Sequence, residues 1–133
     1  MLRVAGLVNG WQRRILRDQE FLRTYIPVLV SAIGMHPVGP VIIQPYAHWM
    51  GGAPSAVQFL EESAAWIHCY PEDDLIQVVL DSCLEIRNPG KVALDISVTL
   101  NLHPHVIHYD KNWGWKALLR DLGSAKRESA IEA

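Results

Sequence analysis

The sequence predicts an α+β fold: a two-layer sandwich with a mainly antiparallel sheet covered on one face by helices. Three strand-like runs, 55–62, 64–70 and 75–83, follow one another at close spacing. A parallel crossover needs a dozen or more residues, so these runs are expected to be antiparallel neighbours. A stretch with helical periodicity before them supplies the covering layer. The chain of 133 residues is expected to form one domain.

The first third of the chain predicts a strand, a helix and a second strand. Residues 2–8 alternate as a strand does. Asp18 is expected to cap a helix that ends near Gly34, and Pro27 is expected to kink it. The apolar positions with helical spacing are Phe21, Leu22, Tyr25, Ile26, Leu29, Val30 and Ile33. The run 38–49 then reads as a strand and ends before a glycine-rich break.

The last third contains two conflicting signals. The sequence PEDD at 71–74 is a clear turn. In 88–102, Asn88 followed by Pro89 favours the start of a helix. The apolar residues Val92, Leu94, Ile96, Val98, Leu100 and Leu102 nevertheless alternate as in a strand. The following HPHVIHYD predicts another strand, WGWKALLRDLG a short closing helix, and the tail a frayed end.

Composition and charge disfavour several classes of protein. The net charge is −2, and no segment concentrates Lys and Arg, so nucleic acid is not an expected partner. No apolar run approaches the roughly 20 residues of a membrane span, and the N-terminus does not read as a signal peptide. The two cysteines, Cys69 and Cys83, are therefore expected to be reduced thiols of a cytoplasmic protein.

The segment EESAAWIHCYPE, residues 61–72, raises the question of chemistry inside the sheet. Ser63, His68 and Cys83 are the reactive side chains of the central strands, although each residue type also packs in cores without reacting. Glu61 and Glu62 are adjacent, so on a strand they face opposite sides and do not form a paired acid and base.

A metal site is not expected. The histidines of HPHVIH, at 103, 105 and 108, have no cysteine at ligand spacing and only Asp110 as a nearby carboxylate.

The order of these residues resembles the prokaryotic short form of the S-adenosylmethionine decarboxylase family. Its self-cleavage segment reads roughly E-S-H-I-x-I-H-T-W-P-E. Glu62-Ser63 stands at the cleavage bond, Ile67-His68 at the processing histidine and Pro71-Glu72 at the P-E pair. Cys83 stands at the proton donor, and Ser55 at a serine used during processing.

The resemblance implies a pyruvoyl-dependent decarboxylase that makes the aminopropyl donor for spermidine. Ser63 would attack the Glu62 carbonyl, cut the chain into 1–62 and 63–133, and become the pyruvoyl cofactor, without a metal. His68 would transfer protons during processing, with Ser55, and Cys83 would protonate the substrate. The resemblance also implies a helix in 88–102 and a homodimer. The substrate-binding candidates are Tyr70, Glu72, Trp49 and Tyr46.

Four positions depart from the family pattern. Ala64 replaces a usual His beside the cleavage bond, Cys69 a Thr, Tyr70 a Trp and Leu84 a Gly. Tyr70 keeps an aromatic face for stacking. Two alternatives follow: a relative that decarboxylates another amino acid, such as ornithine or arginine, or an unprocessed homologue that binds or regulates without catalysis.

Overall fold

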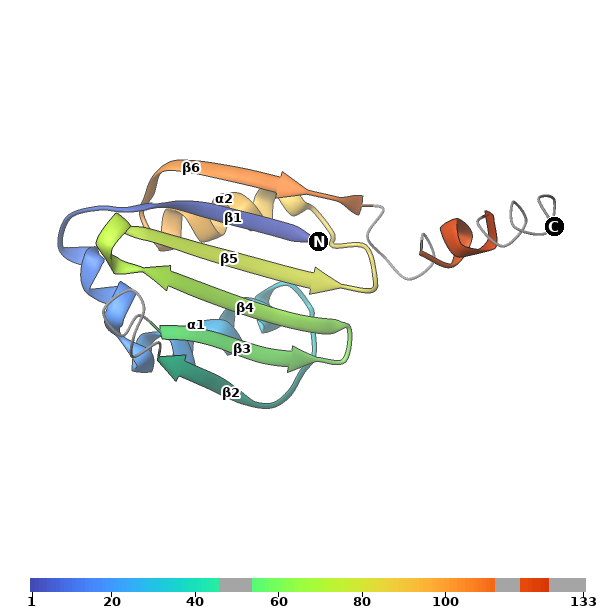
Figure 1. Ribbon diagram of the computed structural model, residues 1–133, viewed down its shortest axis with the longest axis horizontal. Helices are drawn as coiled ribbons and strands as arrows, with labels where there is room; N and C mark the ends of the chain where they lie inside the picture. The colour runs from blue at the N-terminus through green and yellow to red at the C-terminus, as the bar shows by residue number, and fades with distance from the viewer. Residues whose placement is uncertain (46–53, 112–117, 125–133) are drawn as a thin grey trace, which may run out of the picture.

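The structure, a computed structural model, describes residues 1–45, 54–111 and 118–124. These residues form a six-stranded antiparallel sheet with the order β2-β3-β4-β5-β1-β6 and helices on one face (Figure 1). The strands are β1 (Leu2–Val8), β2 (Pro37–Pro45), β3 (Pro54–Leu60), β4 (Ser63–Tyr70), β5 (Leu75–Ser82) and β6 (Leu102–Tyr109). The helices are η1 (Gly10–Arg17), α1 (Gln19–Ala32), η3 (Pro71–Asp73) and α2 (Pro89–Thr99), and residues 118–124 are also helical. The predicted α+β sandwich is confirmed.

The three central runs pair as antiparallel neighbours, as predicted. The turn at Glu61 and Glu62 joins β3 to β4, and Ser55 lies opposite His68 in this pair. The predicted turn after β4 is the short 3-10 helix η3. It leads into β5, where Ser82 lies opposite Ser63. This register sets which side chains of distant sequence position meet at each end of the sheet.

The helix α1 begins and ends where the sequence predicts. The Asp18 carboxylate accepts a hydrogen bond of 3.0 Å from the Phe21 backbone N–H and so caps the first turn. Pro27 lies inside the helix, which continues to Ala32. Gly34 has a φ of +77°, a left-handed conformation that glycine adopts readily, and the chain turns there toward β2.

The ambiguous segment 88–102 is a helix over Pro89–Thr99, followed by β6. The helix buries Val92, Ala93, Ile96 and Ser97, which are spaced as one helical face. Small residues at 93 and 97 pack inward, while Leu94 and Val98 of the alternating set are 57% and 70% exposed. The strand-like alternation therefore arose because two apolar residues lie on the exposed side of the helix.

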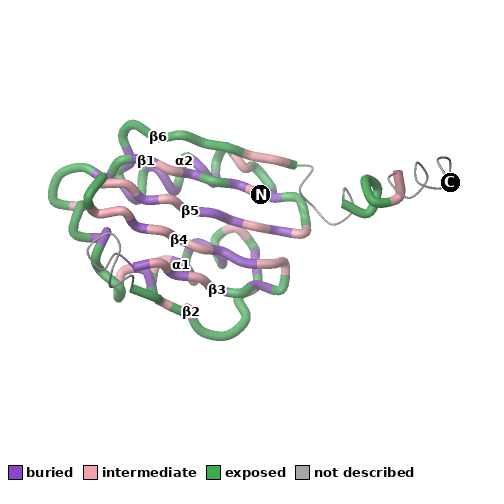
Figure 2. Tube along the Cα trace, in the orientation of Figure 1, coloured by how far each residue is buried: buried purple, intermediate pink, exposed green. Residues whose placement is uncertain are grey.

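The helices leave the other face of the sheet open. α1 contacts β2, β3 and β4, and α2 contacts β1 and β6. Figure 2 shows buried residues along the central strands and exposed residues along β6. The open face carries apolar side chains that water reaches, among them Leu7, Val38, Ile42, Phe59 and Val106. Exposed apolar clusters of this kind mark interaction surfaces.

No described helix has the length and apolar character needed to cross a membrane.

Candidate active site

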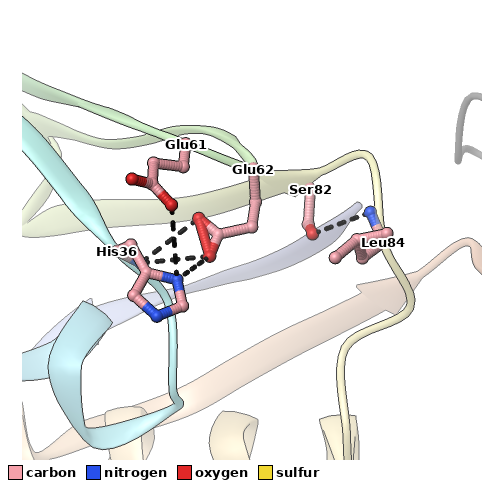
Figure 3. Close-up of polar contacts among 5 residues, drawn as sticks. All are labelled: His36, Glu61, Glu62, Ser82 and Leu84. Carbon is pink, nitrogen blue, oxygen red and sulfur yellow. Dashed lines mark hydrogen bonds and ion pairs between the residues drawn. The ribbon is translucent and has the colours of Figure 1, made fainter.

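The Glu62–Ser63 peptide bond lies at the turn where β4 begins. The carbonyl oxygen of Glu62 accepts a hydrogen bond of 2.8 Å from the backbone N–H of Cys83. Cys83 reaches this position because it follows directly after Ser82, the register partner of Ser63. The Ser82 hydroxyl in turn accepts a 3.1 Å hydrogen bond from the Leu84 N–H and fixes the turn around Cys83 (Figure 3). An N–H donor on a carbonyl oxygen polarises the carbonyl and stabilises negative charge on it.

The hydroxyl of Ser63 donates a hydrogen bond of 3.1 Å to Oδ2 of Asp81. Asp81 lies on the neighbouring strand β5, opposite Ala64. A carboxylate that accepts the hydroxyl hydrogen is placed to take this proton as the oxygen attacks a carbon. The Glu62 carbonyl and the Ser63 hydroxyl are thus each held by one partner from the end of β5.

The side chain of Glu62 is held by His36 (Figure 3). Nδ1 of the imidazole lies 2.6 Å from Glu62 Oε1, and the His36 backbone N–H lies 3.1 and 3.2 Å from the two carboxylate oxygens. Burial favours the neutral carboxyl, but the hydrogen bonds from His36 outweigh it and lower the pKa of Glu62. The hydrogen bond to Glu62, together with its charge, raises the pKa of His36.

A second polar pair lies on the open face of the sheet. Ser55 Oγ and His68 Nδ1 are 2.7 Å apart, because their residues are register partners on β3 and β4. Burial of the ring lowers the pKa of His68, so the imidazole is neutral near pH 7 and can accept a proton. The Tyr70 ring lies on the same face, with its centroid 6.5 Å from that of His68.

A pocket of about 290 Å³ opens beside this pair. It is lined by Ser55 and His68 together with Ile42, Gln44, Ala56, Val57 and Trp66. Its mixture of an aromatic wall and a few polar groups is typical of a small-molecule site. A hollow of about 440 Å³ between α1 and α2 lies on the other face and contains none of the predicted site residues.

Ser63 and His68 do not meet within one chain. They are five positions apart on β4, which at about 3.3 Å per residue separates their Cα atoms by about 16 Å. An odd spacing along a strand also directs the two side chains to opposite faces. The structure therefore brings together Ser55 with His68, and Glu62 with Cys83, but leaves the two sets at opposite ends of β4.

The remaining predicted residues fall into two groups. Tyr70 is half-buried beside His68, and Glu72 is exposed in η3. Trp49 and Tyr46, the other substrate-binding candidates, lie outside the described residues.

The two cysteines are both free but lie in different environments. Cys83 is half-buried beside the Glu62–Ser63 turn. Cys69 is buried in the core, where desolvation raises the pKa of its thiol to about 12 and keeps it protonated.

Two residues at this site were not foreseen from the sequence. His36 and Asp81 are separated by 26 and 18 positions from the partners they hold. Only the strand register could have indicated these two residues. Asp81 is adjacent to Ser82, the register partner of Ser63. His36 immediately precedes Pro37, the register partner of Leu60 at the end of β3. Within the described part of the chain, no three His, Cys, Asp or Glu side chains form a group that could hold a metal.

Comparison with known proteins is consistent with this geometry. Residues 5–111 match the protein family described as S-adenosylmethionine decarboxylase. The fold is similar to the crystal structure of the adenosylmethionine decarboxylase from Aquifex aeolicus VF5, with a TM-score of 0.60 and 17% sequence identity, over 83% of this chain and 88% of that chain. At this identity the likeness shows a shared fold. Among the curated proteins, no sequence match is found.

Proposed function

This chain belongs to the S-adenosylmethionine decarboxylase family, and we propose that it cleaves itself at Glu62–Ser63 to become a pyruvoyl-dependent decarboxylase. The main support is the 2.8 Å hydrogen bond from the Cys83 N–H to the Glu62 carbonyl oxygen, next to a serine nucleophile. The proposed substrate is S-adenosylmethionine, and the proposed product is the aminopropyl donor of spermidine synthesis.

The cleavage uses groups that the chain itself provides. Ser63 Oγ attacks the Glu62 carbonyl carbon while its proton passes to Asp81, which already accepts that hydrogen at 3.1 Å. The Cys83 N–H stabilises the negative charge on the carbonyl oxygen. The C–N bond then breaks, the Ser63 nitrogen takes up a proton, and an ester remains. The Ser63 α-proton then passes to a base, proposed to be the neutral imidazole of His68 from a second copy. Its loss expels the Glu62 carboxylate and leaves dehydroalanine, which reacts with water to give ammonia and the pyruvoyl group.

The fold retains both pieces after this cut. The piece 1–62 contains β1, β2 and β3, and the piece 63–133 contains β4, β5 and β6. Three strand pairs, β3 with β4, β1 with β5 and β1 with β6, cross between the pieces. The buried residues of both pieces also share one core. Loss of one turn peptide removes none of these interactions.

When formed, the pyruvoyl group supplies a carbonyl that binds the substrate amine and accepts the electrons released with carbon dioxide. The residues around Ser63 fit a site for making this group, since a polarised carbonyl and a hydrogen-bonded hydroxyl lie on adjacent residues. The proposed role of the Cys83 thiol is to protonate the substrate carbon. Tyr70 is proposed to stack on the adenine, and Glu72 to contact the substrate from the end of β4.

A homodimer is the proposed assembly, because one chain separates its own site residues. The Ser55–His68 pair lies on the open face of the sheet, about 16 Å along β4 from Ser63. The exposed apolar side chains of that face suit burial against a second copy. In a two-fold arrangement, each copy offers the same surface to the other. His68 of one copy can then approach Asp81 of its partner, which lies opposite Ala64 on the open face and accepts the hydrogen bond of the Ser63 hydroxyl.

Two experiments test these proposals. Intact mass of the purified protein is expected to show the pieces 1–62 and 63–133 in place of one 15.0 kDa chain, and Ser63→Ala to remain uncleaved but folded. Persistence of the 15.0 kDa species in the wild type would favour the unprocessed, non-catalytic alternative. Carbon dioxide release from S-adenosylmethionine, ornithine and arginine then separates the proposed substrate from the amino-acid alternatives.

Co-expression of two inactive variants tests the shared site. Neither Ser63→Ala nor His68→Ala alone is expected to be cleaved efficiently. A mixed dimer contains one site with an intact Ser63 and an intact His68, so the His68→Ala chain should be cleaved when both variants are present. Absence of cleavage in the mixture, with mixed dimers verified by mass, would place His68 in the same chain as its Ser63 or outside the reaction.

A further inference from the structure

His36 and Glu62 form a reciprocal contact between two turns of the chain (Figure 3). The His36 backbone N–H donates to the Glu62 carboxylate, and the His36 carbonyl accepts a 2.9 Å hydrogen bond from the Glu61 N–H. The left-handed turn at Gly34 directs the chain from α1 into this contact. The backbone of residue 36 is therefore bonded to both residues of the turn that precedes Ser63.

The imidazole adds a charged interaction to this backbone frame. Its Nδ1 lies 2.6 Å from Glu62 Oε1 and 3.9 Å from Glu61 Oε2. The Glu62 side chain is only 10% exposed, whereas that of His36 is 68% exposed. A carboxylate with so little access to water needs partners on the protein, and His36 supplies them.

Glu62 is also the residue whose carbonyl carbon is attacked. Its carbonyl oxygen is bonded to Cys83 and its carboxylate to His36, so the residue is held at both its main chain and its side chain. Rotation of the scissile peptide away from the Ser63 hydroxyl would break one of these contacts. Small displacements of reacting atoms slow reactions strongly, so such restraint favours cleavage.

We propose that His36 is a positioning residue for the Glu62–Ser63 cleavage and that it then holds the newly formed C-terminus. This inference rests on the proposed self-processing. The inference goes beyond self-processing because His36 lies on neither β4 nor β5, the strands that carry the other groups at the Glu62–Ser63 bond.

The contact becomes more favourable after the cut. Breakage of the ester leaves Glu62 with an α-carboxylate in addition to its side-chain carboxylate. A protonated His36 is then the counter-charge for two negative groups on one residue, while the Cys83 N–H remains a donor to the main-chain oxygen. The end of the 1–62 piece therefore stays at the site and does not fray into solvent.

The charge states define a pH window for this contact. The titratable groups that the described structure places against the ring are Glu61 and Glu62. Since the pKa of His36 is raised, the charged contact is complete below the ordinary histidine value and is lost as the pH rises through the raised value. Since the pKa of Glu62 is lowered, the contact persists above the ordinary carboxyl value and is lost as the pH falls through the lowered one.

The experiment compares cleavage rates of the wild type, His36→Gln and His36→Ala by intact mass between about pH 5 and pH 9. His105→Gln, an exposed histidine on β6, is the matched control. The His36 backbone N–H survives in the variants, so only the ring contribution is lost. An exposed ring contact predicts cleavage slower by a factor of about 2–5 near neutral pH. The deficit should vanish above the raised His36 pKa and shrink in about 1 M salt.

Equal rates and equal pH profiles for the wild type and His36→Gln would overturn the inference while leaving self-processing intact. Absence of cleavage in the wild type would overturn both. A second measurement does not depend on rate: NMR titration of the His36 imidazole in uncleaved Ser63→Ala and in the cleaved wild type. We expect a raised His36 pKa in Ser63→Ala and a still higher one in the cleaved wild type. An ordinary pKa in both would also refute the contact.

Discussion

Replacement of Asp81 by Asn separates the proposed role of this residue as a proton acceptor from its structural contribution. The two side chains have nearly the same shape, and the amide oxygen of Asn can still accept a hydrogen bond from the Ser63 hydroxyl. What is lost is the negative charge, and with it the capacity to take the proton. A hydrogen bond to a charged group contributes about 1.5–3 kcal/mol and a neutral one about 0.5–1.5 kcal/mol, so the expected loss of folding free energy is about 1 kcal/mol.

The expected effect of Asp81→Asn on cleavage is much larger. General base catalysis commonly contributes about 10²–10⁴-fold, which corresponds to about 3–5 kcal/mol of activation free energy. The cleavage rate, followed by intact mass, should therefore fall by at least about 10²-fold while urea unfolding changes little. Asp95→Asn, an exposed carboxylate on α2, is the control for a simple charge change. An Asp81→Asn chain that cleaves at the wild-type rate would show that the 3.1 Å hydrogen bond to Ser63 is only structural.

Further substitutions test the chemistry and the packing. Cys83→Ala keeps the backbone N–H on the Glu62 carbonyl, so the chain should still cleave, whereas carbon dioxide release should fall by about 10²–10⁴-fold; wild-type turnover would return the thiol to a packing role. Gly6→Ala should destabilise the fold by about 1–3 kcal/mol in urea unfolding, because a Cβ there would lie 2.8 Å from the Pro104 carbonyl oxygen. Gly90→Ala, where a Cβ meets nothing within 4 Å, is its control and should be neutral or stabilising by up to about 1 kcal/mol; equal effects at both glycines would contradict the packing argument.

The fold was largely predictable because the main helices and strands have local sequence signals, such as helix caps and short connections, that agree with the observed packing. Asp18 caps α1 as expected, and the short connections around 61–62 and 71–74 force antiparallel neighbours. The segment 88–102 shows where local pattern is insufficient. Its alternation suited a strand, and the helix is favoured because Ala93 and Ser97 are small enough to pack against the sheet. Small residues such as Ala93 and Ser97 can thus decide which face of a helix is buried.

The site was only partly predictable, because reactive residue types are visible in a sequence and register is not. The motif identified Ser63, His68 and Cys83 as candidates, and their roles remain predictions. The spacing of five residues, once 63–70 is taken as one strand, already places Ser63 and His68 on opposite faces, and matching to the motif overlooked this. The motif could not reveal that His36 lies against Glu62, since that contact depends on how the end of α1 meets the β3–β4 turn.

The strand register also suggests how a chain with Ala64 beside the Glu62–Ser63 bond could carry out the proposed cleavage. The S-adenosylmethionine decarboxylase family usually has a histidine at position 64. Its replacement by alanine removes a titratable group, which favoured the alternative of an unprocessed homologue. In this structure Ala64 lies opposite Asp81 on β5, and the carboxylate of Asp81 accepts the hydrogen bond of the Ser63 hydroxyl. The titratable group next to the nucleophile is thus present, but it comes from the neighbouring strand. If Asp81 accepts the Ser63 proton in place of the histidine that the family usually has at position 64, then Ala64→His should restore cleavage in an Asp81→Asn variant. Failure of that double variant to cleave faster than Asp81→Asn alone, with folding intact by urea unfolding, would show that the two positions do not substitute for each other.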